Sequence, residues 1–200
     1  MKQRGKFQLF SLIEFSDWVK GLEVLRSITI LQNHHTYIPD YKNFLKRPDH
    51  FFWVESMERG HLERGFDQIA QQITTFPDGM ICIGRPFEKI PAGIKGANAQ
   101  GVCMEHLGNF DIGADTMTED HKKTIVGINA ILCKKFTIQP TVNGIVYHHW
   151  YDLNTGVRVK DFSKATTKTC PGTNFFGGNT EEACTKNFIP QIDRLVNSTK

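Results

Sequence analysis

Two short, apolar, β-rich runs of this chain lead into a pair of histidines, and this placement constrains the fold most. The runs and their histidines are Ser27–Leu31 before His34-His35, and Gly144–Tyr147 before His148-His149. Chemistry in α/β folds usually lies at strand ends. Adjacent side chains of a strand point to opposite faces, so each pair should offer only one histidine to a shared point at the edge of a sheet.

Segments with helical spacing alternate with the strand-like runs. The predicted helices are Ser11–Leu22, Asp49–Glu63, Lys123–Phe136 with a capping box at Thr116 and Glu119, and Thr180–Ile189. Further strands are predicted over 69–76, 80–84 and 101–107. This alternation predicts an α/β fold: a single domain with a central mixed β-sheet flanked by helices. We expect residues 1–24 to form an N-terminal helical extension packed on a domain of residues 25–200.

Length and charge narrow the class of protein. The 200 residues suit one domain, which we expect to be a monomer. A net charge of +3, without a basic run interleaved with aromatics, gives no indication of nucleic-acid binding, although it would suit an anionic polymer. No apolar run approaches membrane-spanning length, and Phe7–Phe15 is too polar for a signal peptide. We therefore expect a protein without a membrane partner, made in the cytoplasm and exported or released by another route.

The cysteines indicate free thiols. There are five, an odd number with wide spacing and no CxxC motif, which argues against a disulfide framework. Cys82, Cys103 and Cys133 stand in apolar runs and are expected to be small buried hydrophobic residues. Cys170, in Lys-Thr-Cys-Pro-Gly, is available for chemistry.

Zinc would suit the remaining candidates. It prefers histidine nitrogen and cysteine sulfur, and a catalytic zinc needs only three protein ligands. One histidine of each pair together with Cys170 would complete such a set. The residues alone do not say which histidine of each pair takes part.

An ordered set of motifs resembles a known family. His34-His35-Thr36 is followed by Phe76-Pro77-Asp78-Gly79 with Gly84-Arg85, Glu105-x-x-Gly108-Asn109-Phe110-Asp111, His148-His149, and Lys168-Thr169-Cys170-Pro171-Gly172. This order is similar to that of N-acetylmuramoyl-L-alanine amidases, which include peptidoglycan recognition proteins and amidase-type phage lysozymes. The resemblance runs from about residue 28 to 178. It is nearest to bacterial and prophage members.

The resemblance implies roles for individual residues. His34, His148 and Cys170 would bind Zn²⁺, and Lys168 would lie near the reacting carbonyl. His35 and His149 would then have supporting roles. Residues 25–200 would form a zinc amidase domain acting on peptidoglycan, in cell-wall lysis or remodelling.

One position departs from the family. Many members carry a catalytic Tyr where this chain has Gln71, and glutamine cannot act as acid or base. Glu105, in an otherwise apolar strand, is the natural substitute as general base. A solvent-facing strand glutamate is the alternative. Phe175 and Phe176 could line a substrate groove or belong to the core, and residues 154–164 are expected to form an inserted polar loop.

The predicted reaction is hydrolysis of the amide between the lactyl group of N-acetylmuramic acid and L-alanine. Three alternatives stay open: a non-catalytic peptidoglycan-binding protein, a Cys-His thiol hydrolase, and a structural zinc protein, which would need a fourth ligand. The first is favoured by Gln71 and disfavoured by Cys170.

Overall fold

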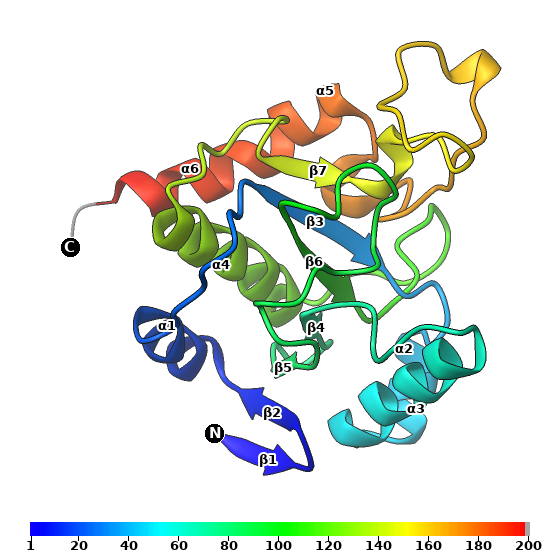
Figure 1. Ribbon diagram of the computed structural model, residues 1–200. Coiled ribbons are helices and arrows are strands. Elements are labelled where there is room, and N and C mark those ends of the chain that lie inside the picture. The colour runs from blue at the N-terminus through cyan, green and yellow to red at the C-terminus, as the bar shows by residue number, and fades with distance from the viewer. Residues whose placement is uncertain (199–200) are drawn as a thin grey trace.

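A mixed sheet of seven strands forms the centre of the computed structural model, which describes residues 1–198 (Figure 1). The strands lie in the order β1-β2-β5-β4-β6-β3-β7. Their bounds are β1 (Lys2–Arg4), β2 (Phe7–Phe10), β3 (Ile30–His35), β4 (Ile73–Thr75), β5 (Ile81–Ile83), β6 (Gly101–His106) and β7 (Ile145–Tyr147). The strands β4, β6, β3 and β7 run parallel, whereas β1, β2 and β5 are antiparallel to their neighbours. The predicted α/β class and mixed sheet are confirmed.

Helices cover both faces of the sheet. On one side, α4 packs against α1 and α6. On the other side, α3 packs against β2 and β5, and α2 joins α3 to the end of β3 (Figure 1). The helices are α1 (Leu12–Lys20), α2 (Tyr41–Lys46), α3 (His50–Glu63), α4 (Glu119–Phe136), α5 (Glu181–Ala183) and α6 (Ile189–Asn197). No helix within residues 1–198 is long and apolar enough to cross a membrane.

The N-terminal segment contains more than the expected helix. Ser11 caps α1 in a capping box, as the sequence indicates. Before it, however, β1 and β2 form a hairpin, and β2 pairs with β5. The first residues are therefore part of the central sheet. The sequence pattern of this segment did not predict these two strands.

Two other local predictions are corrected by the structure, and one short helix was not predicted. The cap of α4 is Thr118, whose side chain accepts from His121 N, and not Thr116. The C-terminal helix does not end at Pro190, because Pro190 lies in the first turn of α6, where its missing N–H is not needed. The loop after β3 contains the short helix α2, started by an Asp40 cap.

The two aromatics after Cys170 belong to the core side of the molecule. Phe175 is fully buried, and Phe176 is partly buried with its ring 4.4 Å from that of Phe188. Neither lines the groove described below. Of the two interpretations of these residues, the core assignment is therefore the correct one.

A chain of hydrogen bonds runs beneath the sheet, on the side of α4. Tyr41 Oη lies 2.7 Å from His121 Nδ1, and Thr75 Oγ1 lies between His121 Nε2 and His106 Nδ1, at 2.7 and 2.8 Å. His106 Nε2 then meets Asn33 Oδ1 at 3.1 Å. Each donor can be matched to one acceptor along this chain if both histidines are neutral. Burial lowers the pKa of His121 to about 3 and that of His106 well below its usual range, which keeps them neutral.

Candidate metal centre and substrate groove

Three side chains from distant parts of the sequence converge at the end of the sheet. His34 lies near the end of β3, and His148 begins a 3₁₀ turn directly after β7, the neighbour of β3. Cys170 lies in a loop that the backbone of His149 pins by donating to Cys170 O, at 2.7 Å. One ligand atom from each of His34, His148 and Cys170 lies within 4.8 Å of the other two.

The distances and protonation states of this cluster fit zinc. Cys170 Sγ lies 3.5 Å from His34 Nδ1, and two such ligands of a tetrahedral zinc are about 3.5 Å apart. Burial lowers the pKa of His34 well below its usual range, so the imidazole is neutral, as metal ligation requires. Within residues 1–198 the cluster has three members, which leaves a fourth position for water or substrate.

The other two histidines of the pairs are engaged elsewhere. His35 Nδ1 accepts a hydrogen bond from Phe110 N at 3.1 Å. His149 Nδ1 lies 2.6 Å from Lys168 O, and its ring stacks on Phe162 with centroids 4.8 Å apart. Alternation along a strand separates His34 from His35. His148 and His149 lie in a 3₁₀ turn and not in a strand, so strand alternation does not explain why their side chains point to different places.

Glu105 lies next to the cluster because its strand pairs with β3. In the parallel register of β3 and β6, Glu105 is the partner of His34, so both side chains emerge on the same face. The carboxyl is partly accessible from the groove but enclosed by protein elsewhere. Burial raises its pKa to about 8, while the cations of Lys168 and Arg64 oppose that rise.

Burial also raises the pKa of Cys170, the cysteine of the cluster. It raises the pKa of the Cys170 thiol well above its ordinary value, and the carboxyl of Glu105 adds to the rise. A thiol in this environment is a poor nucleophile. A bound cation would reverse the effect and favour the thiolate.

The cluster lies in a groove of about 1030 Å³. One wall is α3, whose groove-facing residues follow a helical stripe. They are Trp53, Ser56, Met57, Gly60, His61 and Arg64. The other face of α3 buries Phe51 and Val54 in the core. The sequence predicts this helix but no function for it, although the repeated spacing of three and four residues marks its groove-facing stripe.

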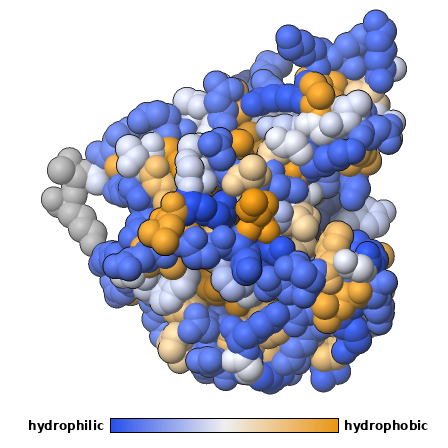
Figure 2. Space-filling model, in the orientation of Figure 1, coloured by the Kyte–Doolittle hydropathy of each residue, from blue (hydrophilic) through white to orange (hydrophobic). Residues whose placement is uncertain are grey.

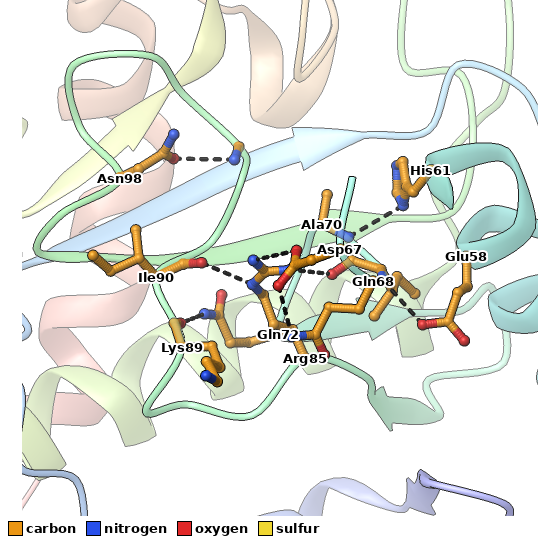
Figure 3. Close-up of polar contacts among 12 residues, drawn as sticks. Glu58, His61, Asp67, Gln68, Ala70, Gln72, Arg85, Lys89, Ile90 and Asn98 are labelled. Atoms are coloured by element: carbon orange, nitrogen blue, oxygen red, sulfur yellow. Dashed lines mark hydrogen bonds and ion pairs between the residues drawn. The ribbon is translucent and has the colours of Figure 1, made fainter. Parts of the chain in front are cut away.

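Arg85 holds the segment between α3 and β4 in place (Figure 3). Its buried guanidinium donates to Asp67 Oδ1 at 2.9 Å through two nitrogens, and its Nε donates to Ile90 O at 2.7 Å. The same segment is tied to α3, because Ala70 N donates to His61 Nδ1 at 3.1 Å (Figure 3). The sequence showed Arg85 only as part of a Gly-Arg motif. In the structure it positions the segment that is tied to α3, one wall of the groove.

Gln71 lines the groove. Its side chain is buried, and its Nε2 donates to Thr74 Oγ1 at 3.1 Å. Its Oε1 has no hydrogen-bond partner among the described residues. This atom can accept a hydrogen bond from a ligand but cannot transfer a proton.

A family model described as N-acetylmuramoyl-L-alanine amidase matches residues 25–173. The chain belongs to the N-acetylmuramoyl-L-alanine amidase family. The resemblance seen in the ordered motifs is thereby confirmed. No curated protein matches this amidase-family chain.

Solved structures of amidases and recognition proteins share the fold of this amidase-family member. N-acetylmuramoyl-L-alanine amidase LysC from Clostridium intestinale is 19% identical with a TM-score of 0.56, over 80% of this chain and 85% of that one. Drosophila PGRP-LB is 22% identical with a TM-score of 0.56, over 82% and 84%. A point mutant of PGRP-LB, in complex with tracheal cytotoxin, is 22% identical with a TM-score of 0.52, over 78% and 84%.

Proposed function

We propose that this protein is a zinc-dependent N-acetylmuramoyl-L-alanine amidase. The observation that carries the proposal is the convergence of His34, His148 and Cys170 in an open groove beside Glu105. These three residues would hold the ion. The substrate would be the amide between the lactyl group of N-acetylmuramic acid and L-alanine of the stem peptide.

Glu105 and Lys168 would have separate roles in this reaction. Bound zinc would supply a Lewis acid for the carbonyl and water that ionises near neutral pH. Glu105 is paired with His34 in the register of β3 and β6, and a bound cation would favour its ionised form, so its carboxylate can take a proton from water and deliver it to the leaving amine. Lys168 forms no ion pair among the described residues and lines the groove, so its ammonium can stabilise charge on the carbonyl oxygen.

Size and charge of the groove suit a muramyl peptide. About 1030 Å³ is enough for a sugar with several amino acids. The cations of Lys168 and Arg64 favour the carboxylates of stem peptides. That PGRP-LB, with a similar fold, was solved with tracheal cytotoxin agrees with such a ligand. Because the groove lies within one chain, a monomer would be sufficient for this activity. It would act on the cell wall after release or export.

Digestion of purified peptidoglycan, followed by mass spectrometry, tests the proposal. We expect stem peptides with a free L-alanine amino group and glycan that keeps its lactyl carboxylate, and we expect a chelator to stop their release. Binding to peptidoglycan without any release from zinc-loaded protein would instead favour a recognition protein, for which Gln71 is the supporting feature. Loss of activity only with a thiol-blocking reagent, and not with a chelator, would favour a thiol hydrolase.

A further inference from the structure

Tyr37, on the rim of the groove, has an exposed ring on a strained backbone. It follows the metal-binding strand β3 closely, lines the groove, and is 52% exposed. Its φ is 61°, in the left-handed region that side chains other than glycine seldom occupy. Such strain persists only where surrounding structure enforces it, and it concentrates at ligand sites.

Neighbouring hydrogen bonds enforce this conformation. Tyr37 N donates to Gly108 O at 3.0 Å, and Ile38 N donates to Thr36 O at 2.7 Å. The Thr36 hydroxyl in turn accepts from Gly108 N at 2.8 Å. The backbone is therefore held on both sides of the tyrosine, which fixes the direction of its Cα–Cβ bond.

The ring itself is supported on one side only. Its centroid lies 5.9 Å from that of His35, at an interplanar angle of 63°. The phenol makes no hydrogen bond within residues 1–198. Ile38, which is 73% exposed, continues the apolar surface along the groove. Figure 2 shows hydrophobic residues gathered on the α2 side of the molecule.

We propose that Tyr37 is a stacking platform for the pyranose ring of the muramyl group. An exposed aromatic ring with a polar tip suits the C–H face and hydroxyls of a sugar. Tyr37 follows His34 by three residues, so their Cα atoms are at most about 11 Å apart. The lactyl ether places the scissile amide a few bonds from the pyranose, so a sugar on Tyr37 would be within reach of the cluster. The inference rests on the proposed amidase function, and assigns the sugar end of its groove.

Two substrates that differ only in the sugar test the platform. N-acetylmuramoyl-L-alanyl-D-isoglutamine carries the pyranose, whereas D-lactoyl-L-alanyl-D-isoglutamine keeps the same amide without it. We expect Tyr37→Gly to lower kcat/KM about three- to tenfold for the muramoyl substrate, the usual worth of an aromatic contact. The loss should be confined to that substrate. Tyr37→Phe should retain the muramoyl rate within about twofold.

The glycine variant also controls for misfolding. Glycine accepts the left-handed conformation without strain, so the Tm of Tyr37→Gly should equal or exceed that of the unmodified protein. Leu45→Ser, which removes an exposed hydrophobic residue on α2 away from the groove, is the matched surface control and should change neither rate. Equal losses on both substrates, or no loss on either, would overturn the platform.

A binding measurement separates this inference from the proposed reaction. In the Glu105→Gln background, calorimetric titration should show weaker muramoyl-dipeptide binding when Tyr37 is glycine, by the same factor. If the unmodified protein binds this ligand through Tyr37 but hydrolyses nothing, the amidase proposal fails and the platform stands. Hydrolysis that is indifferent to Tyr37 would reject the platform alone, and absence of both binding and hydrolysis would reject both.

Discussion

Cys170 Sγ lies 3.5 Å from His34 Nδ1, although 136 residues separate the two in the chain. This contact joins the end of a central strand to a distant loop, and His148 completes the group. An ion bound by His34, His148 and Cys170 would therefore link three segments of the fold. The centre is therefore expected to matter for stability as well as for activity.

The first prediction concerns metal content. His34→Ala, His148→Ala and Cys170→Ser should each lose most of the roughly one zinc per chain, because two remaining ligands bind weakly. His35→Ala and His149→Ala are the matched controls and should keep it, since their side chains bond elsewhere. Elemental analysis after dialysis measures the metal. Full zinc in His148→Ala, or its loss in His149→Ala, would refute the ligand assignment.

The second prediction concerns the general base. Glu105→Gln keeps the size of the side chain and removes only the ionisable group. We expect the variant to retain zinc and to lose activity by about 10²–10⁴-fold. Release of stem peptide by the purified variant is the measurement. Gln71→Tyr, which introduces the phenol that the family resemblance implies at this position, should not be needed for activity. An undiminished rate in Glu105→Gln would assign the proton transfer to another group.

The third prediction concerns the space behind His34. A Cβ on Gly93 would lie 2.2 Å from Gln32 Oε1, 2.8 Å from Cys103 Sγ and 3.1 Å from His34 Nε2. Gly93→Ala should therefore displace one of these groups, lower stability by about 1–3 kcal/mol, and weaken zinc retention. Urea unfolding and zinc competition with a chelator measure the two effects.

Gly60→Ala is the matched control for this substitution. Gly60 lies within α3, and a Cβ there meets nothing within 4 Å. The change should raise stability by about 0.5–1 kcal/mol through helix propensity. Equal stability losses in the two variants would contradict a local steric cause at Gly93.

The fourth prediction concerns acid stability. His121 is buried, and its folded pKa of about 3 lies below the usual 6.5. A depressed histidine pKa means that the unfolded chain binds protons first, so stability is fully present above about pH 6.5 and falls as pH decreases toward 3. Each such histidine should contribute a loss of about 1.4 kcal/mol per pH unit below 6.5. Urea midpoints at pH 7 and pH 5 measure the slope.

His121→Phe tests the source of this slope. The variant should be less stable at pH 7 by about 1–3 kcal/mol, because Tyr41 and Thr75 lose a partner. Its stability should nevertheless fall less steeply between pH 7 and pH 5. A slope equal to that of the unmodified protein would show that other groups control acid unfolding.

The sequence by itself determined the α/β class, the family and the order of the candidate ligands. These follow from periodicity and from short motifs, which are local properties of the chain. Helix α1 and the strand before His148 were readable for the same reason. That only one histidine of the first pair would face the cluster was also accessible, because alternation along a strand is a local rule. The preference for His34 over His35 came from the family resemblance.

Only the tertiary structure decided how the groove is built. The helical spacing of α3 is visible in the sequence. Its position facing the candidate metal centre depends on Arg85 and on the packing of the segment before β4. The raised pKa of Glu105 arises from burial by residues distant in sequence. The hairpin of β1 and β2 exists because β5 offers it an open edge. Such contacts between remote segments have free energies that no local pattern encodes, so they appear only once the chain has folded.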